Sequence, residues 1–286
     1  MKFTIKSNAK INIGLNVEGK LPNGYHLLDM VMVPISLSDI LDIEFVSVPG
    51  DLHIDSNKED IPRGSENILY KVYEKFYKKT GLKKEEIKIF LEKNIPHEAG
   101  LGGGSSNGAL FLKLLNEHHK NILSLDEMLE LGKTVGADIP FFILNRPCRV
   151  QGIGEKLEEI ENNLNCKLIV IKPNFGVSTA KAYKNVGEIK SLKKGNIEQI
   201  LEGLKRNSLD MVRQNIENSL EQGLLLDNED IIGFRKELAS FGELEFFMSG
   251  SGSAYFAFVE RDRGELYLDK LEKGIKNCEV YLCDFQ

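Results

Sequence analysis

Hydrophobic and polar residues alternate with a period of two in several segments of the chain. Residues 2–6 (KFTIK), 9–17 (AKINIGLNV) and 40–48 (ILDIEFVSV) follow this pattern, and residues 86–92 (EIKIFLE) follow it just before a run of glycines. Such alternation predicts strands that turn one face toward a core. A period near 3.6 marks residues 65–81, which predicts a helix that begins at Ser65 and ends at Gly81.

The second half of the chain repeats this mixture of patterns. Residues 166–173 (CKLIVIKP) read as a strand, and residues 228–242 read as a helix with Gly242 as its C-terminal cap. Two strand-like runs flank the turn MSGSGSA at residues 248–254, and a helix and a strand follow. Alternating strands and helices predict an α/β or α+β protein with layered sheets. The polar segment at residues 158–165 marks the most suitable boundary between two domains.

Composition narrows the class of protein. The chain of 286 residues is 42% hydrophobic and 28% charged, as in ordinary globular proteins. Its net charge of -6 argues against a nucleic-acid binder, which needs a basic face. The four cysteines lack metal-ligand spacing and are expected to be buried thiols. Because the chain has neither a signal peptide nor an apolar run long enough for a bilayer, we expect a cytoplasmic protein.

A glycine-rich stretch joins a predicted strand to a predicted helix. Its sequence from Ile95 to Leu112 is IPHEAGLGGGSSNGALFL, which matches neither a P-loop nor the dinucleotide pattern G-x-G-x-x-G. Glycines let backbone N–H groups converge on an anion, and the first turn of a helix adds further N–H groups. Ser105 and Ser106 can cap this helix or offer hydroxyls to phosphate or magnesium. The alternative is a simple turn with a serine cap.

Four segments together carry a family resemblance. They are residues 7–41, which include AKINIGLNV and PNGYH, residues 95–109 with GLGGGSS, residues 135–143 (VGADIPFFI), and residues 247–258 with MSGSGSA. In this order they resemble the GHMP kinases, and the resemblance covers nearly the whole chain. It implies an α+β fold of two domains, at residues 1–160 and 161–286. The first would be ribosomal-protein-S-five-like and the second ferredoxin-like, with the active site between them.

The resemblance also implies an ATP-dependent kinase with magnesium. In the family, a lysine at the position of Lys10 stabilises the phosphoryl group in flight, and an aspartate at the position of Asp138 accepts the proton of the acceptor alcohol. From the residues alone, Lys10 can equally lie on a solvent face and Asp138 can be a helix cap. The ATP-binding residues implied are Lys93 and Asn67 near the adenine, and Pro96, His97, Glu98, Ala99, Gly100, Leu101, Gly102, Gly103, Gly104, Ser105 and Ser106 around the triphosphate, with Ser105 and Ser106 as magnesium ligands.

The segment PNGYH distinguishes one kind of acceptor within the family. The resemblance implies that the acceptor is a cytidine diphosphate sugar-alcohol, bound by Asn12, Tyr25, His26, Ile153 and Tyr183. From the residues alone, a tyrosine and a histidine after a turn are more often packing residues. A homoserine or mevalonate type of kinase, or a non-catalytic nucleotide-binding module, are the alternative functions.

Some residues in and around these motifs depart from the family pattern or allow more than one interpretation. His97 and Glu98 stand where most relatives have small residues, and Asn107 stands where an aspartate is common. MSGSGSA is either a simple hairpin turn or, by resemblance, a support for the glycine loop. His118 and His119 are expected to face solvent on different sides of the helix that follows this loop.

Overall fold

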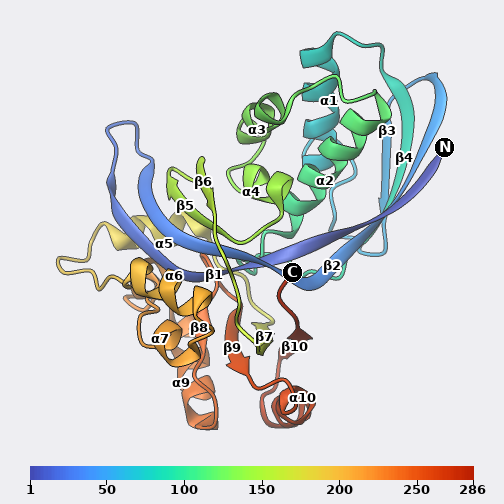
Figure 1. Ribbon diagram of the computed structural model, residues 1–286. Coiled ribbons are helices and arrows are strands. Elements are labelled where there is room, and N and C mark those ends of the chain that lie inside the picture. The colour runs from blue at the N-terminus through green and yellow to red at the C-terminus, as the bar shows by residue number, and fades with distance from the viewer. The chain divides into compact units, whose positions relative to one another are not determined.

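The computed structural model describes residues 1–286 and divides into two compact units that alternate along the chain (Figure 1). Unit 1 comprises Met1–Ala9, Leu37–Ile95 and Gly102–Asn145, and unit 2 comprises Lys10–Ser36, Pro96–Leu101 and Arg146–Gln286. The chain passes from one unit to the other within two long strands, β1 (Lys2–Lys20) and β2 (His26–Pro49). The segments predicted as two strands at residues 2–6 and 9–17 are therefore one continuous strand. The predicted single boundary near residue 160 stays a prediction.

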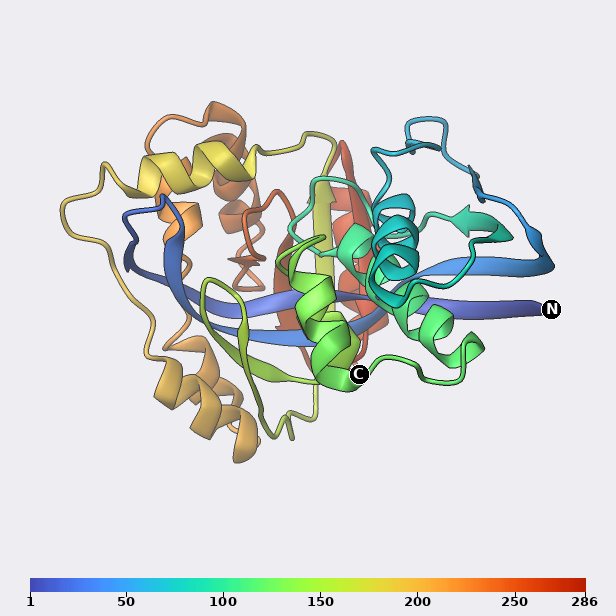
Figure 2. The same cartoon turned by 90° about the horizontal axis from the view of Figure 1, so that it is seen from above.

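In unit 1, four helices pack with the first part of β1, up to Ala9, and with the later part of β2, from Leu37 onward. The later part of β2 pairs antiparallel with β4 (Glu85–Glu92), which pairs parallel with β3 (Leu52–Ser56). The helices are α1 (Ile68–Thr80), α2 (Gly103–His118), α3 (Leu125–Lys133) and α4 (Ile139–Leu144). Both views show α1 and α2 side by side (Figures 1 and 2). At the contact between these helices, a Cβ on Gly108 would lie at ordinary van der Waals distances of 3.4 Å from Ile68 and Val72 of α1.

Helix α1 begins two residues later than its predicted start. Its N-cap is Asn67, whose side-chain oxygen accepts the N–H of Leu69 at 2.9 Å, so the prediction of Ser65 is wrong. An asparagine oxygen satisfies an end N–H group as well as a serine does, and here Asn67 stands directly before the first buried turn. The predicted end is confirmed, because Gly81 adopts the left-handed conformation with φ 70°.

Unit 2 is built around a four-stranded antiparallel sheet in the order β10-β7-β9-β8. The strands are β7 (Lys167–Pro173), β8 (Phe247–Met248), β9 (Tyr255–Val259) and β10 (Cys278–Cys283). The early part of β2 pairs with β5 (Cys148–Gly152), which pairs with β6 (Lys156–Glu159). The helices of this unit are α5 (Thr179–Val186), α6 (Ile197–Lys205), α7 (Leu209–Arg213), α8 (Ser219–Leu224), α9 (Glu229–Phe241) and α10 (Gly264–Gly274). Sheets and helices of this kind confirm the α+β class.

The cysteine thiols and the lengths of the helices bear on two further predictions made from the sequence. All four cysteines are free thiols, and three of them are buried, as expected. Burial raises the pKa of the Cys166 thiol to about 11, so this group is not a reactive thiolate. None of the helices combines the length and the apolar character that a membrane span requires.

Candidate functional site

The chain that leads into the glycine loop is held by a buried ion pair in unit 1. The Lys93 ammonium donates to the Asp39 carboxylate at 2.7 Å and to the Ile95 carbonyl at 2.5 Å. The other oxygen of Asp39 accepts the N–H groups of Asn94 and Ile95 at 2.8 and 2.7 Å. Burial lowers the pKa of the Lys93 ammonium, and the charge of Asp39 opposes this shift. Lys93 thus already holds the backbone, and its expected contact with ATP stays a prediction.

The first half of the glycine loop packs against the MSGSGSA turn, and both belong to unit 2. The N–H groups of Ser253 and Ala254 donate to the carbonyls of Glu98 and Ala99 at 3.2 and 3.1 Å. The hydroxyl of Ser249 donates to the carbonyl of Gly100 at 3.2 Å. A Cβ on Gly100, whose φ is 72°, would lie 2.1 Å from the Ser249 carbonyl oxygen. Only glycine allows this approach, and the turn acts as a support for the loop.

Lys10 and Asn12 meet this loop from strand β1. The backbone N–H of Lys10 donates to the Leu101 carbonyl at 3.0 Å, and its ammonium donates to the side-chain oxygen of Asn12. Both side chains are buried, at 4% and 2% exposed. A Cβ on Gly250 would lie 3.1 Å from the Lys10 ammonium, from the Asn12 oxygen and from the Gly100 carbonyl. Lys10 is therefore not on a solvent face, and its charge lies beside the glycine loop.

Helix α2 starts without a serine cap. Its N-cap is Gly102, with φ 72° and no side-chain hydrogen bond, so the alternative in which Ser105 or Ser106 caps the helix is wrong. The first backbone hydrogen bond at this end runs from the Ser106 N–H to the Gly102 carbonyl, and the N–H groups before it have no partner within the helix. The buried Ser106 hydroxyl accepts that of Ser7 at 2.7 Å, whereas Ser105 is half-buried.

The side chain of Glu98 packs against the chain near Gly176. This residue has φ 47°, and its carboxylate packs so closely on Gly176 that a Cβ there would lie 1.9 Å from it. Burial lowers the pKa of Lys172, while the charges of Glu279 and Glu98 oppose that shift. The Lys172 ammonium in turn donates to the carbonyl of Phe175 at 2.8 Å, next to Gly176. Glu98 is thus part of the packing that shapes this side of the loop.

Asp138 stands at the N-cap position of α4 in unit 1. It has helical backbone angles of φ -87° and ψ -7°, and its carboxylate makes no capping hydrogen bond. The side chain is half-buried. The interpretation of Asp138 as a helix cap is therefore wrong for its side chain.

Two of the residues expected to bind the acceptor form an aromatic pair in unit 2. The rings of His26, the first residue of β2, and Tyr183, in α5, stack with centroids 4.9 Å apart and an angle of 22° between their planes. Burial and the charge of Lys20 lower the pKa of His26, so its imidazole is neutral at pH 7. Tyr25 and Ile153 are exposed, at 59% and 36%.

Asn67, also predicted to contact ATP, has a side chain that makes two hydrogen bonds to the backbone of unit 1. Its amide caps α1, as described, and also donates to the Pro62 carbonyl at 2.6 Å. Its role at the adenine stays a prediction.

Two further side chains, not predicted from the sequence, hold the loop and its support. Asp39 is fully buried and anchors Lys93, and Asn218 donates to the carbonyls of Met248 and Gly250 at 2.8 and 2.9 Å. The Asn218 oxygen also caps α8, by accepting the N–H of Leu220 at 2.9 Å. An asparagine before SLEQ is a recognisable cap signal, but nothing near Asp39 indicates a buried carboxylate.

Two family profiles match the chain. The profile of the N-terminal domain of GHMP kinases matches residues 67–146, and the profile of the C-terminal domain matches residues 189–277.

Individual proteins match over almost the full length. A 4-diphosphocytidyl-2-C-methyl-D-erythritol kinase of Fusobacterium nucleatum is 45% identical over 99% of this chain and 97% of that protein. The kinase of the same name from Clostridium tetani is 36% identical over 97% of this chain and 98% of that protein.

Solved structures share the fold. The crystal structure of a 4-(cytidine 5'-diphospho)-2C-methyl-D-erythritol kinase matches with a TM-score of 0.79 and 30% identity, over 98% of this chain and 99% of that one. A homoserine kinase from Cytophaga hutchinsonii matches with a TM-score of 0.74 over 99% of this chain and 95% of that one. Its 17% identity supports a common fold alone.

Proposed function

Because the chain belongs to the GHMP kinase family, we propose that it transfers the γ-phosphoryl group of ATP to the 2-hydroxyl of 4-diphosphocytidyl-2-C-methyl-D-erythritol. The product is the 2-phosphate, an intermediate of the non-mevalonate route to isoprenoid precursors. The observation that carries this proposal is the 45% identity, over 99% of the chain, to the Fusobacterium nucleatum kinase of that name. The geometry of the candidate site supports it in three respects.

The triphosphate of ATP is bound by residues 96–106, mainly through the backbone N–H groups of the residues between Pro96 and Ser106. The N–H groups of Gly103, Gly104 and Ser105 precede the first hydrogen bond of α2 and form the positive end of its dipole. Magnesium ions prefer oxygen ligands, and the half-buried hydroxyl of Ser105 fits this preference better than that of Ser106, which already accepts the hydroxyl of Ser7. A magnesium ion held there would neutralise charge on the phosphates of ATP.

Asp138 and Lys10 each have one role in the proposed chemical step. The acceptor oxygen forms a bond to the γ-phosphorus, the bond from this phosphorus to the leaving ADP oxygen breaks, and the Asp138 carboxylate takes the hydroxyl proton. The Lys10 ammonium stabilises negative charge on the phosphoryl group in transit. Support comes from the burial of Lys10 beside the Gly100 carbonyl and from the carboxylate of Asp138, which is not used as a cap.

Recognition of the cytosine falls to the aromatic pair. A neutral His26 has one ring nitrogen that donates and one that accepts, so it can read the edge of a base. Tyr183 offers a flat face for stacking, and the 4.9 Å contact between the two rings supports their acting together. Tyr25, Ile153 and Asn12 complete the proposed acceptor site.

A panel of acceptors tests the proposal. The purified chain is mixed with ATP and magnesium and with the cytidyl substrate, homoserine or mevalonate, and ADP release is measured. We expect turnover on the cytidyl compound alone. Comparable turnover on homoserine or mevalonate, or none on the cytidyl compound, would contradict the assignment.

A further inference from the structure

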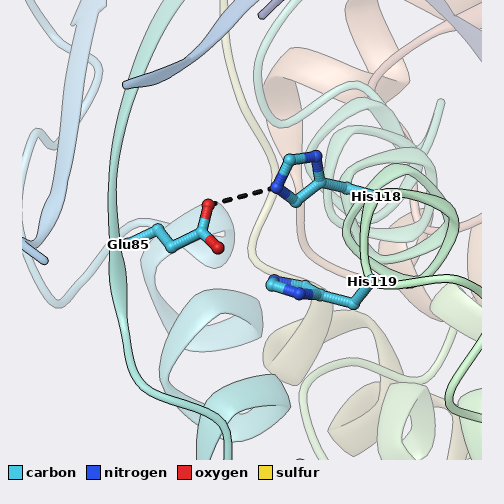
Figure 3. Close-up of side chains that lie close together, drawn as sticks. All are labelled: Glu85, His118 and His119. Carbon is cyan, nitrogen blue, oxygen red and sulfur yellow. Dashed lines mark hydrogen bonds and ion pairs between the residues drawn. The ribbon is translucent and has the colours of Figure 1, made fainter. Parts of the chain in front are cut away.

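Three side chains that can bind a metal ion converge at the C-terminal end of α2, within unit 1. His118 is the last residue of this helix, His119 follows it, and Glu85 is the first residue of β4 (Figure 3). One ligand atom from each of the three lies within 4.8 Å of the others, and all three side chains are half-buried. The expectation that both histidines face solvent is wrong.

The end of the helix explains how two adjacent histidines meet. Successive residues of a continuous helix point about 100° apart, which separates their side chains. Here the helix stops, and His119 takes φ -92° and ψ 29° as its C-cap. The two imidazole centroids are therefore only 4.9 Å apart, at an angle of 80° between the ring planes. Figure 3 shows both rings reaching from the helix end toward Glu85.

Aromatic packing holds each imidazole in place. The ring of His118 stacks on Phe45 with centroids 3.8 Å apart, and that of His119 stacks on Phe76 at 5.5 Å. The hydroxyl of Tyr77 lies 3.1 Å from Nε2 of His119. These contacts reduce the freedom that the side chains would lose on binding an ion.

The spacing of the donor atoms suits a small transition metal ion. Ligands of a tetrahedral zinc ion at bond lengths of about 2.0–2.1 Å lie roughly 3.3 Å apart. Oε2 of Glu85 and Nε2 of His118 are already 3.1 Å apart, and the ligand atom of His119 lies within 4.8 Å of both. Imidazole suits zinc and similar metals, whereas magnesium and calcium prefer oxygen ligands.

We propose that Glu85, His118 and His119 form a binding site for a divalent transition metal ion, for which zinc is the best fit. Three protein ligands leave a fourth position for water or for the Tyr77 hydroxyl. The site is at the opposite end of the 16-residue helix α2 from the glycine loop, roughly 24 Å away. The ion joins the start of β4 to the end of α2 and stabilises unit 1, and it takes no part in phosphoryl transfer.

Titration of the full chain with Zn²⁺ or Co²⁺, without nucleotide, tests this site. Calorimetry is expected to give one tightly bound equivalent, and zinc is expected to raise the melting temperature as its concentration increases. Bound Co²⁺ is expected to show visible d–d absorption without a thiolate charge-transfer band, because the four cysteines belong to unit 2. Absence of a tight equivalent, or a thiolate band, would overturn the proposal.

Matched variants assign the ligands. Glu85→Gln and His118→Gln are each expected to weaken zinc binding by about 100-fold. Glu85→Gln keeps the shape of the side chain and can still accept a hydrogen bond from His118, so it tests the site even if His118→Gln does not fold. His53→Gln removes an exposed histidine of β3 and is expected to leave zinc affinity unchanged. Equal affinities of Glu85→Gln and His53→Gln would contradict the assignment.

Discussion

Two regions of unit 2 differ in how tightly their side chains are enclosed. Beside the glycine loop, Lys10 and Asn12 are 4% and 2% exposed, and Gly100 approaches the Ser249 carbonyl too closely for any Cβ. At the proposed base site, Tyr25 and Ile153 are 59% and 36% exposed. Lys10, proposed for the phosphate chemistry, is thus part of the packed interior, whereas Tyr25 and Ile153, proposed for base recognition, are at the surface.

This difference has a physical reason. Phosphoryl transfer is accelerated by charges and N–H groups held in fixed positions, and close packing keeps them fixed. Base recognition requires a flat aromatic face that a base can cover, and the half-buried pair of His26 and Tyr183 beside the exposed Tyr25 provides one. Changes beside the loop should therefore affect catalysis or stability, and changes at the base site should affect acceptor affinity alone.

The largest effect is expected from Asp138→Asn. An amide of the same shape cannot accept the hydroxyl proton, so we expect kcat to fall by about 10²–10⁴-fold, measured as ADP release. Calorimetry should show that ATP binding is retained. Asp126→Asn, at an exposed position in the first turn of α3, serves as the control and should keep full activity. Full activity of Asp138→Asn would remove this residue as the general base.

The second-largest effect is expected from Gly100→Ala, which should lower both stability and activity. The added Cβ would meet the Ser249 carbonyl at 2.1 Å with φ at 72°, and we expect a loss of about 2–4 kcal/mol in the free energy of unfolding. Thermal and urea unfolding measure this loss. Gly233→Ala in α9, where a Cβ meets nothing within 4 Å, is the control and should be neutral or more stable by up to about 1 kcal/mol. Equal stabilities of the two variants would refute the packed-loop interpretation.

The smallest effect is expected from His26→Ala. Loss of the stack with Tyr183 and of a hydrogen bond to the base should raise the KM for the cytidyl substrate by about tenfold. The KM for ATP and the melting temperature should not change, and His53→Ala should behave as the unchanged chain. If His26→Ala lowered the stability as much as Gly100→Ala does, this result would contradict the proposed difference between the two regions.

Local patterns predicted much of the fold. The strands at residues 86–92 and 166–173, the ends of two helices at Gly81 and Gly242, and the α+β class follow from periodicity and cap residues. The start of α1 was predicted two residues early, since serine and asparagine both suit a cap and only the surrounding packing selects between them. The family of the chain followed from the order of four short motifs.

The sequence by itself determined which positions lack a Cβ, such as Gly100, and which motifs mark the family. Such features are local, because a missing Cβ acts on the residue that lacks it. Tertiary structure alone decided that Asp39 reaches Lys93, that His26 stacks on Tyr183, and that Glu85 meets two histidines at the end of α2. These pairs are 33 to 157 residues apart in the chain, and only the packing of strands and helices into a core brings them into contact.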